Sequence, residues 1–143
     1  MNSETLALLK ECDSGAKMSV TSLRDMAEKT QGSELKKIIE DSIEKHEKLG
    51  AKVGDMLRES GEDGKEPNPM AKMMSHMKIT VKVTDKDGDR EIAALCTDGC
   101  NMGIKQLSKC INDSKNAEEK AIKLANAIVE HEEGLIKEVR PYL

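Results

Sequence analysis

Four long stretches of the chain place apolar residues three or four positions apart, which is the spacing of one face of an α-helix. The first runs from about Ser3 to Thr30 and the second from Ser33, an expected N-cap, to about Ser60. The third begins near Asp89, and the fourth runs from about Asn116 to Pro141. The pattern therefore predicts two helical hairpins, over residues 3–60 and 89–141, within a single domain of residues 1–143.

The connection between the hairpins, residues 61–88, has a different pattern. It opens with the break Gly61-Glu62-Asp63-Gly64 and continues through Pro67-Asn68-Pro69. Methionines then recur at helical spacing, whereas residues 78–83 alternate as a strand would. We expect a short helix that Pro69 enters at its first turn, so that the connection forms a long crossover between the hairpins.

The two hairpins share sequence motifs. The segment that begins at Cys12 matches the segment that begins at Cys96 in its Cys, Gly, Met, aliphatic and Leu positions, at an offset of 84 residues. Residues 43–47 match residues 128–132 at an offset of 85, with the sequence His-Glu at the end of each. Because two matches occur in order at nearly the same offset, we expect the hairpins to be diverged copies.

Two hairpins and a long connection favour a bundle in which the second and third helices run parallel, as in ferritin-like proteins. Residues 64–71, 97–103 and 140–143 resemble segments of small uncharacterised bacterial four-helix-bundle proteins of the ferritin-like superfamily. The resemblance spans nearly the whole chain. It implies an all-α ferritin-like four-helix bundle, and it implies no activity.

The di-iron site of ferritin-like proteins needs a Glu-x-x-His pair on each of two helices. In this chain Ile43 stands three residues before His46, and Ile128 stands three residues before His131. No residue can therefore be carried over as a di-iron ligand, and we expect neither ferroxidase nor oxygenase chemistry.

A different set of polar residues lies on or beside the apolar stripes. His46 falls at the centre of its stripe, Glu132 near the centre of another with His131 at the edge, and Cys96 and Cys100 share a buried face. Imidazole, thiolate and carboxylate together bind zinc, iron or copper, so these five residues are candidate ligands of a transition-metal or redox site. The favoured interpretation is simpler: the cysteines are small core residues, and His46 is a hydrogen-bonded buried imidazole.

The methionines of the connection form a second candidate site. Met70, Met73, Met74 and Met77, with His76, present thioethers and an imidazole that suit Cu(I), or an adaptable apolar surface that suits a partner helix. The simplest interpretation is that these side chains pack onto the bundle.

The composition removes several classes of function. Only 1% of the residues are aromatic, with one Tyr and no Phe or Trp, and the net charge is −4. All-β folds and base-stacking platforms rely on aromatic side chains, and duplex binders carry a basic surface. We therefore expect no nucleic-acid role.

The expected location follows from absent sequence signals. The N-terminal residues have no basic region before an apolar run, and no stretch approaches the roughly 18 apolar residues of a membrane span. The four cysteines are then expected to be reduced in the cytoplasm. We expect a non-catalytic cytoplasmic bundle protein that forms a homodimer and has no cofactor or membrane partner. The alternatives are the transition-metal or redox site and a protein-interaction module in the methionine-rich crossover.

Overall fold

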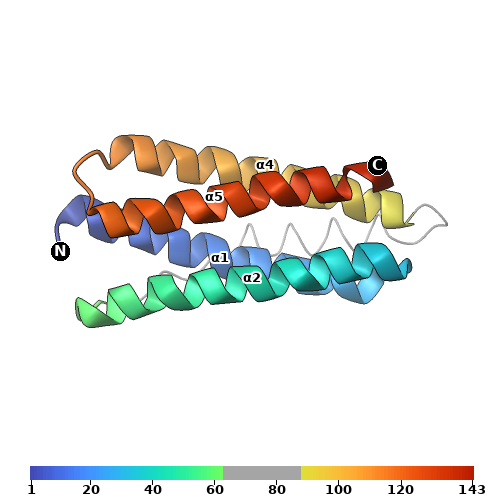
Figure 1. Cartoon of the computed structure of the whole chain (residues 1–143), viewed down its shortest axis with the longest axis horizontal. Helices are drawn as coiled ribbons and strands as arrows, with labels where there is room; N and C mark the ends of the chain where they lie inside the picture. Colours follow the sequence, from blue (N-terminus) through green and yellow to red (C-terminus); the bar gives the residue numbers. More distant parts are fainter. Residues whose placement is uncertain (63–87) are drawn as a thin grey trace.

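The computed structural model describes residues 1–62 and 88–143. Its helices are α1 (Ser3–Lys29), α2 (Ser33–Glu59), α4 (Gly88–Asp113) and α5 (Glu119–Val139), followed by the short 3₁₀ helix η1 (Arg140–Tyr142) (Figure 1). The described ranges contain no strand, which confirms the expected all-α class. The expected crossover helix, with its methionines, lies outside the described residues.

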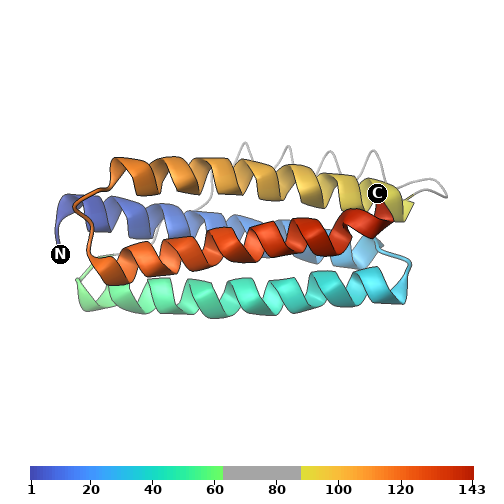
Figure 2. The ribbon, with the colours of Figure 1, turned by 45° about the horizontal axis from the view of Figure 1, so that its top comes forward.

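The four long helices form a bundle, as the apolar pattern predicts. α1 packs against α2 and α4 against α5 as antiparallel hairpins, and the hairpins meet through the pairs α1–α4 and α2–α5 (Figures 1 and 2). α2 and α4 run in the same direction along the bundle, which is the arrangement that a long connection between them permits (Figure 1). In the part of the chain that the structure describes, no helix is both long and apolar enough to span a bilayer.

The turn between α1 and α2 corrects one expectation. Ser33 is the first residue of α2 and not its N-cap; that position belongs to Gly32, which has no side chain to cap the helix. Instead, the Asp89 carboxylate of α4 accepts hydrogen bonds from the backbone N–H groups of Gln31 and Gly32, at 2.8 and 2.7 Å. A carboxylate from a distant helix therefore stabilises the N-terminus of α2.

The fourth helix also begins later than expected, at Glu119 and not near Asn116. Asn116 N–H donates to Glu4 of α1 at 3.0 Å, and Glu118 N–H donates to the Thr5 hydroxyl at 2.8 Å. These contacts hold the turn between α4 and α5 against the start of α1, so the chain enters α5 only after them.

The apolar core consists of two clusters, one toward each end of the bundle. One gathers residues such as Leu8, Val53 and Ile128, and the other gathers residues such as Leu35, Ile92 and Leu135. Between them α2 and α5 contribute the buried polar side chains of Ser42, His46 and Glu132. This polar layer is where the candidate site lies.

Candidate functional site

His46 is the centre of the polar layer. The side chain projects from the middle of α2 and is 1% exposed. Its Nδ1 atom lies 2.9 Å from the Ser42 carbonyl oxygen, and because a carbonyl only accepts, Nδ1 carries a proton and donates it. The second ring nitrogen, Nε2, is thereby directed at Oε1 of Glu132, 3.4 Å away. One turn of α2 thus fixes both the tautomer and the direction of the imidazole.

Ser42 also connects His46 to the second histidine. Its hydroxyl lies 3.3 Å from His46 Nδ1 and 2.8 Å from His131 Nε2. The two imidazole rings are nearly perpendicular, with centroids 4.7 Å apart. Burial, with smaller effects of His46 and Lys45, lowers the pKa of His131 to about 4. At neutral pH His131 is therefore uncharged, and its Nε2 shares a hydrogen bond with the Ser42 hydroxyl.

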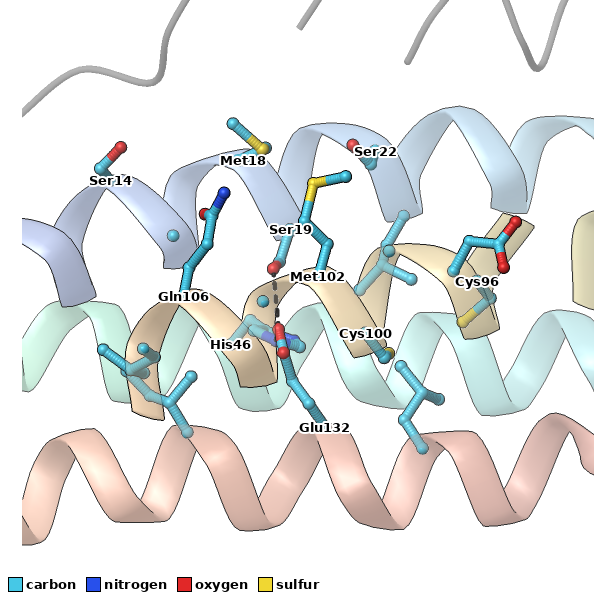
Figure 3. Close-up of a pocket in the computed structure, with 18 of the residues that line it drawn as sticks. Ser14, Met18, Ser19, Ser22, His46, Cys96, Cys100, Met102, Gln106 and Glu132 are labelled. Carbon is cyan, nitrogen blue, oxygen red and sulfur yellow. Dashed lines mark hydrogen bonds and ion pairs between the residues drawn. The ribbon is translucent and has the colours of Figure 1, made fainter. Parts of the chain in front are cut away.

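Glu132 is the buried acid of the layer. It rises from α5 and is 5% exposed, and its Oε1 also accepts the Ser19 hydroxyl of α1 at 3.3 Å (Figure 3). The carboxylate fits because residue 103 of α4 is glycine. A Cβ built at Gly103 would overlap Oε2 and lie 3.1 Å from Oε1 and from Cδ. Gly103 therefore makes room for the carboxylate.

A cavity of about 290 Å³ opens above this carboxylate, between α1 and α4. Met18 and Met102 stand at its outer side, with Glu132 and His46 deeper (Figure 3). Most of its surface is apolar, and residues with small side chains leave the space open; these are Ser14, Gly15, Ser19 and Ser22 of α1 with Gly99 and Gly103 of α4. A Cβ built at Gly99 would meet no described atom within 4 Å.

Cys12, Cys96 and Cys100 line the same cavity and are buried free thiols. Burial raises the pKa of Cys12 to about 12. A hydrogen bond with Cys96, and then burial, raises the pKa of Cys100. Since the thiolate is the nucleophile and the metal ligand, Cys12 and Cys100 remain protonated and unreactive at neutral pH.

The structure brings the five candidate metal residues into one region without forming a ligand cage. Glu132 contacts His46, His131 is joined to His46 through Ser42, and Cys96 and Cys100 line the adjoining cavity. In residues 1–62 and 88–143 no three His, Cys, Asp or Glu side chains are placed to hold one metal ion. The candidate copper and partner site at Met70, Met73, Met74 and Met77 lies outside the described residues.

Sequence reasoning placed His46, His131 and Glu132 but missed what orients them. Ser42 lies on the apolar stripe of α2 four residues before His46, and a polar residue at such a position signals a buried hydrogen bond. The roles of Ser19 and Gly103 toward Glu132 depend on the packing of α1 and α4 against that residue, which the pattern of one helix does not determine.

Comparison with protein-family models, with curated proteins and with solved structures gives no match for this chain. The ferritin-like resemblance therefore remains a prediction, and the function has to be inferred from the residues of the site.

Proposed function

We propose that this four-helix bundle is a non-catalytic protein that binds a small molecule in the cavity between α1 and α4. The observation that supports this function is the combination of a largely apolar cavity with a few convergent polar atoms at Glu132, His46 and Ser19. Small-molecule sites have this composition, and their volumes run from roughly 300 to 1,000 Å³. At about 290 Å³ the cavity suits a small ligand.

The contacts of His46 on the cavity side support a binding role. Nucleophilic catalysis needs a hydroxyl or thiol in contact with a general base. On the cavity side, His46 Nε2 contacts the Glu132 carboxylate, and the Ser19 hydroxyl donates to that same carboxylate. Within the described ranges, the contacts of His46 therefore give it no hydroxyl or thiol to activate in the cavity.

Methionine methyl signals provide the test. The chain has nine methionines, of which Met18, Met26 and Met102 line the cavity, whereas Met1 does not. The ¹³C-methyl spectrum is recorded during titration with three six-carbon probes: 1-hexanol, n-hexylammonium and hexanoate. We expect saturable shifts at Met18 and Met102 with at least one probe and none at Met1. If no probe produces saturable shifts, or if all methionines shift alike, the proposed function is wrong.

Two leucine substitutions locate the binding site. Gly99 lines the cavity and Gly134 of α5 does not, and a Cβ at either position meets no described atom within 4 Å. Gly99→Leu should fill the cavity and weaken probe binding at least tenfold, whereas Gly134→Leu should leave it within twofold. Equal effects of the two substitutions would place binding elsewhere.

A transition-metal ion is the second candidate occupant. The observation that favours it is the orientation of His46, whose Nδ1 donates to a backbone carbonyl, as metal-ligating imidazoles do with the ring nitrogen that faces away from the metal. Elemental analysis of untagged protein separates the two candidates, since the ligand-binding proposal expects no stoichiometric transition metal. Homodimer formation, cytoplasmic location and partner binding through the methionines of the connection stay predictions.

A further inference from the structure

We propose that the ligand of this cavity is an organic cation, an ammonium-type group on an apolar body, and that its charge binds to Glu132. This inference rests on the proposed function and names the chemical class of the ligand. Three features of the cavity support it: the sign of the lining charges, the accessible oxygen of the buried carboxylate, and the chemistry of the walls.

Among the described residues that line the cavity, carboxylates outnumber basic side chains. Glu11 of α1, Asp98 of α4 and Glu132 of α5 contribute carboxylates, and His46 contributes an imidazole. No Lys or Arg occurs among the described residues that line it. Carboxylates of one sign in a cavity with apolar walls raise the local concentration of cations and disfavour anions.

One oxygen of the buried carboxylate is directed at the cavity. Oε1 of Glu132 interacts with Ser19 and His46, whereas Oε2 has no hydrogen bond to any described residue. Every fully inaccessible side-chain nitrogen or oxygen in the described ranges has a partner, so Oε2 is accessible from the cavity. Gly103 leaves this oxygen uncovered by a Cβ. A charge-assisted hydrogen bond from an N–H donor would satisfy it.

The walls favour an organic cation over a hydrated metal ion. Hard divalent cations take six or more oxygen ligands or keep their water, and neither suits a largely apolar cavity. Leu23, Leu95 and Ile128 provide apolar contacts, while Met18 and Met102 add polarisable sulfur. The body of the ligand would contact these side chains, and its charged end would lie at Glu132.

The experiment measures charge selectivity with the three probes of equal length. For the intact protein we expect n-hexylammonium to bind about tenfold more tightly than 1-hexanol, and hexanoate to bind least tightly. Glu132→Gln preserves the size of the side chain and should reduce the ratio of the ammonium and alcohol affinities to near one. Glu133→Gln, at an exposed position of α5 that does not line the cavity, is the matched control and should change that ratio less than twofold.

A salt series identifies which carboxylate acts. Exposed charges are screened at high ionic strength and buried charges much less, so the preference for the ammonium probe should survive about 0.5 M NaCl if Glu132 provides it. Loss of the preference in salt would assign it to surface carboxylates and overturn the inference.

The possible failures are distinct. If none of the three probes binds, the proposed function fails and this inference fails with it. If 1-hexanol or hexanoate binds the intact protein as tightly as n-hexylammonium, the inference alone fails. The comparison within the intact protein needs no variant, so it remains decisive even if Glu132→Gln does not fold.

Discussion

The two hairpins carry the same pair of residues in the same order, His46-Glu47 on α2 and His131-Glu132 on α5, but they bury opposite members. On α2 the histidine is buried, and Glu47 is exposed and paired with Arg24 at 3.3 Å. On α5 the glutamate is buried, and His131 is only partly buried. Because neighbouring helical residues point about 100° apart, a rotation of one residue brings the histidine of one hairpin to the glutamate of the other.

This difference shows how one motif can serve two purposes. The motif on α2 contributes an oriented imidazole and an ordinary surface ion pair. The motif on α5 contributes a buried acid and a histidine that burial keeps uncharged. Substitutions at matching positions should therefore have unequal effects.

The largest expected difference concerns the histidines. His46→Ala removes a side chain that is 1% exposed, together with its contacts to Ser42 and Glu132, and should lower the free energy of unfolding by about 3 kcal/mol. His131→Ala removes a partly buried ring and should cost about 1 kcal/mol. Urea denaturation of both variants measures this. Equal losses would contradict the unequal burial of the two rings.

The glutamates should differ in the same sense. Glu132→Ala removes the acceptor of the Ser19 hydroxyl together with the contact to His46 Nε2, and we expect a loss of about 2 kcal/mol in unfolding free energy. Glu47→Ala breaks an exposed ion pair and should cost less than about 0.5 kcal/mol. If Glu47→Ala lowers the free energy of unfolding as much as Glu132→Ala does, the claim that the buried glutamate contributes more to stability is contradicted.

Substitutions at two glycines of α4 test whether the Glu132 carboxylate fills the space beside Gly103. In Gly99→Ala the helix gains propensity and no described atom is displaced, so the protein should be stabilised by about 0.5–1 kcal/mol. In Gly103→Ala the new methyl group overlaps Glu132, so the protein should be destabilised by about 1–2 kcal/mol. Thermal unfolding measures whether each substitution raises or lowers the stability. The destabilisation by Gly103→Ala should disappear when Glu132 is also replaced by Ala. A penalty that persists there would show that something other than the carboxylate fills the space.

The smallest expected effect is a pH dependence from His131. Its pKa is about 4 in the folded protein and about 6.5 in an unfolded chain, so the unfolded state binds the proton first as the pH falls. The part of the free energy of unfolding that depends on an uncharged His131 is fully present above pH 6.5 and is lost as the pH falls from 6.5 to 4. Because the ring is only partly buried, we expect a loss of about 1 kcal/mol. His131→Gln should remove this part of the pH dependence, and an unchanged profile would contradict the lowered pKa.

The sequence predicts the helices and the buried faces well, because both follow from local periodicity. It also predicts the relative burial of three residues: His46 most, Glu132 next and His131 least. This order follows from the angle of each residue around its own helix relative to the apolar stripe. The turn before α2 could not be predicted in the same way, because Asp89 reaches it from another helix. The cavity and the accessible oxygen of Glu132 depend on how α1 and α4 pack, which no single helix determines.

The central claim is that Glu132 forms the acidic floor of a cavity that accepts an organic cation. The most direct measurement is the intermolecular nuclear Overhauser effect between bound n-hexylammonium and the methyl groups of Met18 and Met102, which stand at the outer side of the cavity (Figure 3). Met102 is 56% exposed, so the apolar end of the probe should lie beside it while the ammonium group reaches Glu132. We therefore predict strong effects from the terminal methyl group of the probe and weak effects from the methylene next to nitrogen. The reverse order would place the charge in solvent and contradict the claim.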